Sequence, residues 1–206
     1  RSALSRATLL GRSFKIRPLL HLCGVPGDPK APKLTSDREM LEGLIEQAVN
    51  SGLAVEQGAG RWRFSHDLIR SQLRKACRAL PNWPELNRAA AGLRIGRAES
   101  DPSGIELEVV ARHFWEAGEK RRALGMGLDG LNRLHSAGLM GHATSFARRL
   151  LRWNEECLML APDDEGELRL LASIAAEHAG QPQEAEKYAR EAANVARNDE
   201  LDALGA

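Results

Sequence analysis

The residues whose types and spacing best suit chemistry are His66 and Asp67, in the stretch Phe64-Ser-His-Asp-Leu-Ile-Arg70. An imidazole at a helix start lies beside backbone N–H groups that have no partner within the helix, and this setting suits contact with an anion. Asp67 in the first helical turn can act as a cap and can orient His66. The stretch therefore predicts an anion contact, or a plain helix cap with Leu68 and Ile69 packed under a hairpin; the two are not exclusive.

A group of basic residues surrounds this stretch. Its members are Arg61, Arg63, Arg70, Arg74, Lys75 and Arg78. Clusters of this kind contact phosphates, and a helix can enter the major groove of DNA. Base readout usually also needs outward-facing Asn, Gln or Ser, and this segment offers mainly Ser71 and Gln72. We therefore expect a solvated or domain-facing basic surface, with DNA contact as the less favoured alternative.

Other catalytic and metal-binding patterns are absent from the sequence. The six histidines form no His-Glu-x-x-His motif, and neither a Gly-x-x-x-x-Gly-Lys-Ser/Thr loop nor a Gly-x-Ser-x-Gly elbow occurs. Cys23, Cys77 and Cys157 are an odd number without a Cys-x-x-Cys pair, so we expect buried thiols rather than disulfides or zinc ligands. The sequence predicts no metal site and no enzyme within this chain.

The composition is that of an ordinary globular protein. Of the 206 residues 43% are hydrophobic and 28% are charged, which excludes disordered and fibrous classes. No run approaches the roughly 18 apolar residues that a membrane span needs, so we expect a cytoplasmic protein without membrane contact. Because the first residue is Arg1 rather than Met, we treat the chain as a fragment of a longer protein.

The charge is divided unevenly along the chain. Residues 1–100 hold 17 lysines and arginines against 9 acidic residues, a net charge of +8, whereas residues 101–206 hold 12 against 19, a net charge of −7. This asymmetry predicts two units, a basic one followed by an acidic one. It favours intramolecular docking, a phosphate-bearing partner of the basic half, or two ordinarily solvated surfaces.

The elements that position His66 follow from local patterns. A Ser-x-x-Glu capping box at Ser36 to Glu39 precedes apolar residues at helical spacing, and Gly58 to Gly60 separates two short alternating runs typical of a β-hairpin. Prolines and glycines over Gly24 to Pro32 predict a loop. We expect helices over 2–10, 14–23, 36–50, 66–80 and 84–98, and strands over 53–57 and 61–65. A pair of helices is thus followed by a helix, a hairpin and another helix, which is the order of elements in a winged-helix fold.

Only helices are expected after Ile105, over 105–117, 121–136, 142–157, 167–179 and 183–197. In three places a glycine that turns the chain is followed five residues later by an alanine that lets the next helix approach closely, as in tetratricopeptide-like repeats. These pairs are Gly118 with Ala123, Gly138 with Ala143, and Gly180 with Ala185. We expect Phe114, Trp115, Phe146 and Trp153 to be core, and stacked helix hairpins to leave a groove for a protein or peptide.

The order of helix pair, hairpin, Phe-x-His-Asp-Leu-Ile-Arg70 and repeats beginning Ala111-Arg-His-Phe-Trp-Glu-Ala-Gly118 resembles bacterial STAND-type signalling ATPases, in the part that follows their P-loop module. In that superfamily the winged helix carries a Met-His-Asp-like motif whose histidine approaches the β-phosphate of ADP and holds the off state. His66 and Asp67 match the His-Asp part, whereas Ser65 stands where the family has Met.

These observations predict a mainly α chain with a winged-helix unit over residues 1–100 and a tetratricopeptide-like unit over residues 101–206. The resemblance implies a regulatory part in which His66 and Asp67 contact ADP or ATP held by an upstream nucleotide-binding module, while the repeats bind a partner or signal. The alternative is a winged-helix DNA-binding transcriptional regulator with a repeat interaction domain, and a passive repeat scaffold is a third reading.

Overall fold

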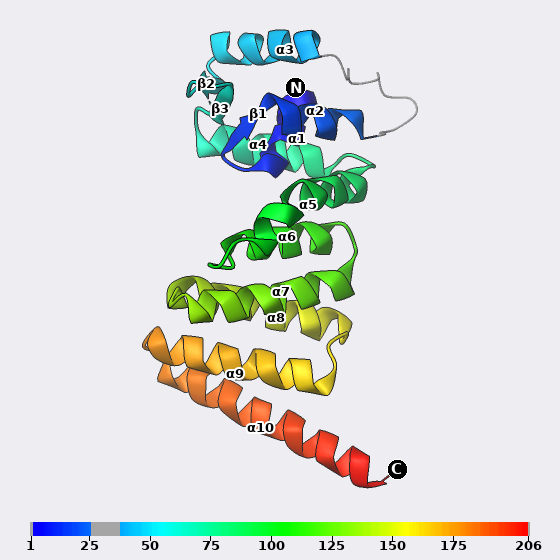
Figure 1. Ribbon diagram of the computed structural model, residues 1–206, viewed down its shortest axis with the longest axis vertical. Coiled ribbons are helices and arrows are strands. Elements are labelled where there is room, and N and C mark those ends of the chain that lie inside the picture. The colour runs from blue at the N-terminus through cyan, green and yellow to red at the C-terminus, as the bar shows by residue number, and fades with distance from the viewer. Residues whose placement is uncertain (1, 26–37, 206) are drawn as a thin grey trace. The chain divides into compact units, whose positions relative to one another are not determined.

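The computed structural model describes residues 2–25 and 38–205 and is mainly helical, with a small three-stranded antiparallel sheet (Figure 1). The chain divides into two compact units, Arg1–Leu93 and Arg94–Ala206. The expected boundary at residue 100 thus lies beyond the observed one, which falls inside helix α5 (Trp83–Glu99).

The first unit follows most of the expected local elements. Its first helical segment and its helix over residues 38–50 are followed by the expected glycines: Gly11 has a φ of 117° and Gly52 has a φ of 69°. The elements are α1 (Ser2–Ala7), the 3-10 turn η1 (Thr8–Leu10), β1 (Ser13–Lys15), α2 (Ile16–Gly24), α3 (Arg38–Asn50), β2 (Ala54–Glu56), β3 (Arg61–Phe64), α4 (Asp67–Arg78) and the first part of α5.

The expectation of a helix beginning at Phe14 is wrong, because Phe14 lies in strand β1 and α2 begins at Ile16. Phe14 is opposite Trp62 in the antiparallel pairing of β1 with β3, and their ring centroids are 6.3 Å apart. The Phe14 ring also lies 5.3 Å from that of Phe64. This aromatic cluster joins residues about fifty positions apart, so tertiary packing overrides the local helical pattern.

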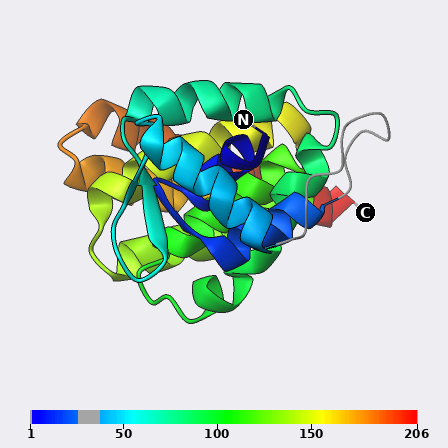
Figure 2. The ribbon, with the colours of Figure 1, turned by 90° about the horizontal axis from the view of Figure 1, so that it is seen from above.

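The sheet has the strand order β1-β3-β2, with both neighbours antiparallel to the central β3. Successive side chains of a strand point to opposite faces. Phe14, Ala54 and Phe64 are buried in the hydrophobic core of the unit, together with residues of α1, α2 and α3. Helix α3 lies alongside the hairpin formed by β2 and β3 (Figure 2). The opposite face of the sheet is exposed and carries the side chains that alternate with this core.

Two sequence predictions lie largely outside the described residues. They are the loop over Gly24 to Pro32, of which Gly24 and Val25 are described, and the capping box that begins at Ser36. Gly24 is the last residue of α2, and Glu39 lies in the first turn of α3.

The second unit contains the end of α5 and five further helices. They are α6 (Ile105–Glu116), α7 (Lys120–Ser136), α8 (Met140–Cys157), α9 (Pro162–His178) and α10 (Pro182–Gly205). Each packs against the next along the chain, as Figure 1 shows. Helix α9 begins earlier than expected because Pro162 occupies its first turn, where a proline loses no intrahelical hydrogen bond. Helix α10 continues past the expected end at Arg197.

Three of the turns between these helices have the same backbone geometry. In each, a glycine at φ between 71° and 81° donates to the carbonyl three residues back, and the next residue donates to the carbonyl five residues back. This is the pattern of a Schellman helix end. The alanine of the following helix is buried each time, as expected. The turns are Gly118 with Ala123, Gly138 with Ala143, and Gly180 with Ala185.

The turn between α8 and α9 differs, because Leu158 rather than glycine adopts the left-handed conformation, with a φ of 50°. Buried Asn154 closes this turn by accepting a hydrogen bond from the Leu160 N–H at 3.1 Å. The expected aromatic core is confirmed for Phe114, Phe146 and Trp153, which are buried, whereas Trp115 is half-buried and stacks on Trp153 with centroids 4.6 Å apart.

Candidate functional site at the junction of β3 and α4

His66 lies at the point where the central strand of the sheet becomes a helix. It is the N-cap residue of α4, with extended backbone angles φ −138° and ψ 147°. Ser65 fixes the junction, because its N–H donates to the Leu53 carbonyl at 3.2 Å and its hydroxyl donates to the Gly52 carbonyl at 2.6 Å. The backbone of His66 is therefore held at both sides, by the strand before it and the helix after it.

The imidazole of His66 is exposed and makes no capping hydrogen bond to α4. Within residues 2–25 and 38–205 we find no hydrogen bond or ion pair of this side chain, and none that joins it to Asp67. The expectation that the His66 side chain caps the helix is therefore wrong. The imidazole is positioned by its backbone and is open to solvent.

Asp67 pairs with two arginines instead of orienting His66. Its Oδ2 lies 3.3 Å from Nη2 of Arg12, and its Oδ1 lies 3.5 Å from Nε of Arg70. Sequence reasoning missed Arg12, because it precedes β1 and reaches the junction only through the pairing of β1 with β3, where the Phe64 N–H donates to the Arg12 carbonyl at 3.2 Å. No short-range spacing could have indicated it.

The apolar residues after Asp67 differ from expectation. Leu68 is 71% exposed and Ile69 is half-buried, so Leu68 does not pack under the hairpin. The buried face of α4 centres on Cys77, with Leu73 half-buried against the core, whereas Ala76 is exposed. The helix thus uses a narrower apolar stripe than its sequence pattern suggested.

The structure separates the predicted basic residues into two groups. Arg61 and Arg63 are exposed on the sheet. Arg70 is half-buried and paired with Asp67, and the half-buried Arg74 places its guanidinium 5.9 Å from the Trp83 ring centroid. Arg70 and Arg74 are therefore engaged within their own unit, unlike the two arginines of β3.

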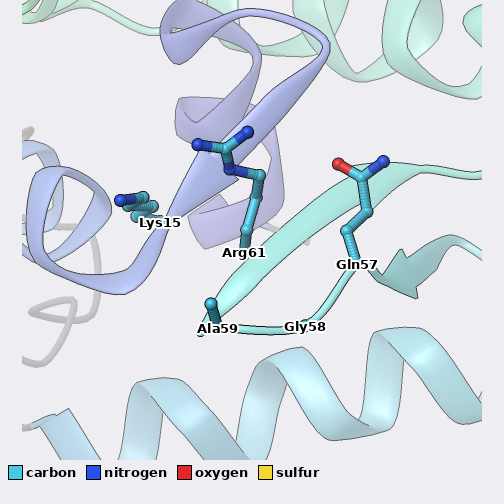
Figure 3. A pocket seen from close by; sticks show the side chains of 5 residues that line it. All are labelled: Lys15, Gln57, Gly58, Ala59 and Arg61. Carbon is cyan, nitrogen blue, oxygen red and sulfur yellow. The ribbon is translucent and has the colours of Figure 1, made fainter.

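A shallow hollow of about 330 Å³ lies at the tip of the hairpin (Figure 3). It is lined by Lys15, Gln57, Gly58, Ala59 and Arg61. Lys15 and Arg61 are directly opposite each other in the β1–β3 register. No spacing in the sequence groups Lys15 with Arg61, and residues 14–23 were expected to form a helix rather than to include part of a strand.

Two of the three thiols are confirmed as buried and free, namely Cys23 and Cys77, whereas Cys157 is half-buried. Burial raises the pKa of the Cys77 thiol to about 11. Within the described ranges no group of three His, Cys, Asp or Glu side chains could hold a metal ion.

Arg6 is a buried cation that sequence reasoning also missed. Its Nη1 donates to three carbonyls at the end of α2, those of Leu22 at 2.6 Å and of Cys23 and Val25 at 3.2 Å. Burial lowers the pKa of Arg6. A guanidinium at these carbonyls satisfies the C-terminus of α2, so this residue has a structural role.

Comparisons of the chain with protein-family models, with curated proteins and with solved structures give no match. No helix in the described part of the chain is long and apolar enough to cross a membrane.

Proposed function

We propose that this chain is the regulatory part of a bacterial, cytoplasmic STAND-type signalling ATPase, with a winged-helix unit followed by tetratricopeptide-like repeats. The observation that carries the proposal is His66, an exposed imidazole without an internal partner at a backbone position fixed by β3 and α4. This is where the Met-His-Asp-like motif of the family meets the β-phosphate of ADP.

The order of elements supports the winged-helix assignment. A helix, a strand, two helices and a hairpin follow one another, and the hairpin pairs with the first strand in the order β1-β3-β2. In the second unit, three glycine turns of the same geometry support the assignment to helical repeats.

The charges beside His66 suit a diphosphate. Arg12 and Arg70 flank the single carboxylate of Asp67, so this part of the surface carries two cations for one anion. The Arg12 side chain is 64% exposed, and an ion pair at such a site is weak enough to exchange for a phosphate. The Ser65 side chain leaves the His66 imidazole accessible, because the Ser65 hydroxyl donates its hydrogen bond to the Gly52 carbonyl.

In this proposal the nucleotide is held by a P-loop module elsewhere in the same polypeptide, and the repeats receive a protein or peptide signal. Contact of His66 with ADP in one state only would bias the equilibrium towards that state, which is what a ligand-controlled switch requires. The chain itself would catalyse no reaction.

The test is the ADP released when the complete protein, purified from its own host, is denatured. We expect stoichiometric ADP with His66 present, a large loss in His66→Ala, and no loss in the matched control His21→Ala, which removes an exposed histidine of α2. Equal ADP in all three proteins, or none in any, would contradict the proposal. Because His66 makes no capping bond, His66→Ala should change the free energy of unfolding by less than about 0.5 kcal/mol.

The alternative, a DNA-binding regulator that reads bases with α4, has weaker support, because α4 offers mainly Ser71 and Gln72 for base contacts and its Arg74 lies against the Trp83 ring. A passive scaffold would leave His66 only a helix-capping role, and its side chain makes no capping hydrogen bond to α4.

A further inference from the structure

We propose that the exposed face of the sheet binds the phosphate backbone of a nucleic acid without reading its sequence. The residues that carry this are Lys15, Arg61 and Arg63, here called the basic sheet face. The proposal goes beyond the function proposed above and does not depend on it, because Arg61 and the hairpin tip lie at the opposite end of β3 from His66.

The register places the three cations on one face. Phe14 and Trp62 are opposite each other and stack on the inner side of the sheet, so their neighbours Lys15, Arg61 and Arg63 project from the other side. All three are exposed. The carboxylate of β2, Glu56, is opposite Trp62 and therefore belongs to the inner side.

These cations are not neutralised within their unit. Among residues 2–25 and 38–205, none of the three side chains forms an ion pair with a carboxylate, in contrast to Arg12 and Arg70. Lys15 and Arg61 are also directly opposite each other, an arrangement of like charges that destabilises an antiparallel pair. An anion that binds between them would remove this repulsion.

The shape of the surface favours an extended anion over a small one. The hollow at the hairpin tip opens between Lys15 and Arg61, and no acidic residue lines it (Figure 3). Arg63 lies two residues farther along β3, at a distance of about 7 Å for extended backbone. A small anion in the hollow would leave Arg63 unused, whereas successive phosphates of a nucleic acid strand have a comparable spacing and engage all three residues.

The polar and acidic residues of the hairpin and of α3 argue against recognition of the base sequence. The carboxamide oxygen of Gln57 already accepts a hydrogen bond from the Ser13 hydroxyl at 3.0 Å. In helix-turn-helix proteins the second helix of the pair enters the major groove. Here that helix is α3, and its exposed Glu39 and Glu46 would repel phosphates. Binding should therefore involve the backbone alone, with equal affinity for unrelated sequences.

The test is fluorescence anisotropy of the whole chain with two short DNA duplexes of unrelated sequence, titrated over a range of salt concentrations. Three phosphate contacts predict that affinity falls about 40-fold between roughly 50 and 200 mM salt. We expect the triple variant Lys15→Gln, Arg61→Gln, Arg63→Gln to lose at least tenfold in affinity and most of the salt dependence. All three residues are exposed, so the variant should fold, which circular dichroism checks.

The matched control is the triple variant Arg121→Gln, Arg152→Gln, Arg197→Gln, which removes the same charge from exposed positions outside the sheet and outside α4. It should bind DNA like the native chain. The proposal is overturned if the native chain does not bind either duplex, if both triple variants lose the same affinity, or if poly-glutamate of matched charge competes as well as DNA. The last result would assign the face to an acidic protein partner.

Discussion

At the residue scale, the junction of β3 and α4 depends on groups that are distant in sequence. Ser65 holds the junction through the Gly52 carbonyl, and Asp67 joins Arg12 to Arg70. A methionine in place of Ser65 could not donate this hydrogen bond, so this chain stabilises the junction with a polar contact. His66 is left without an internal partner, which is the property that a ligand-contacting side chain needs.

The three thiols differ in their burial. We expect Cys157 to react first with iodoacetamide, because it is half-buried, whereas Cys23 and Cys77 are buried and burial raises the pKa of both thiols, that of Cys77 to about 11. A thiol with so high a pKa is almost entirely protonated near neutral pH, and the thiolate is the reactive form. Mass spectrometry of alkylated native and denatured protein measures the order. Equal native labelling of Cys77 and Cys157 would contradict it.

At the element scale, the helices of the second unit approach each other through glycines of α7. A Cβ atom added at Gly127 would lie 2.4 Å from Cδ2 of Leu150, and Leu150 is itself buried in α8. One at Gly130 would lie 3.0 Å from Cβ of Leu107 in α6. By contrast, one at Gly125 would meet nothing within 4 Å. A side chain would therefore meet close contacts at Gly127 and Gly130 but open space at Gly125.

We expect Gly127→Ala to lower the free energy of unfolding by about 1–3 kcal/mol, because the methyl group would displace Leu150 in a packed interface. The matched control Gly125→Ala should raise it by up to about 1 kcal/mol, since alanine has the higher helix propensity and the space is open. Denaturant unfolding of the two variants gives the comparison. The packing argument fails if both substitutions have the same sign.

The start of α6 is capped from outside the helix by Asp101. Its Oδ2 accepts a hydrogen bond from the Glu106 N–H at 2.9 Å, and its Oδ1 accepts bonds from Ser103. The hydrogen bond from the Glu106 N–H lowers the pKa of Asp101 most, and the hydrogen bonds from Ser103 and the positive charge of the nearby Arg133 lower it further.

We expect Asp101→Ala to destabilise the chain by about 1 kcal/mol at neutral pH, the usual value of such a cap. A carboxyl whose pKa is lower in the folded state stabilises the fold fully above its unfolded pKa of about 3.9, and this contribution is lost as pH falls through the folded pKa. The difference between the native chain and the variant should therefore shrink below about pH 4. Unfolding curves at several pH values test this, with the exposed Asp129→Ala as a control that should have little effect.

At the scale of the whole molecule, the second unit is a one-dimensional array in which each helix packs mainly on its neighbours. Helix α10 packs chiefly on α9. Arg148 of α8 also contacts the start of α10, because its Nη2 donates hydrogen bonds to Gln181 at 2.5 Å and to Glu184 at 2.6 Å. These two hydrogen bonds, here called the Arg148 clamp, therefore stabilise the last helix together with its packing on α9.

We expect the amides of α10 to exchange with deuterium faster than those of α8, which has packed neighbours on both sides. Arg148→Ala should speed exchange in α10 several-fold while leaving α6 and α7 unchanged. Arg152→Ala, at an exposed position of the same helix, should leave α10 as it is. Hydrogen-exchange mass spectrometry measures all three proteins, and uniform acceleration in Arg148→Ala would contradict a local clamp.

Features that depend on neighbouring residues could be predicted from the sequence. The helical spacing before Asn50, the hairpin around Gly58 to Gly60 and the three glycine turns are all present, because backbone preferences and short-range periodicity act within one element. The position of His66 at a helix start was likewise local and is confirmed. The two roles that the sequence left open for His66, an anion contact and a helix cap, share this position.

Contacts between residues that are distant in sequence could not be predicted in this way. Phe14 lies in a strand because β3 supplies Trp62 and Phe64 to pack against it, and the same pairing brings Arg12 to Asp67 and Lys15 to Arg61. Arg70 and Arg74 differ from the expected solvated basic surface, because Arg70 forms an ion pair with Asp67 and Arg74 lies over the Trp83 ring. Each of these contacts joins side chains whose separation in sequence bears no relation to their distance in space, so the free energy that fixes them comes from packing and charge pairing rather than from local propensity.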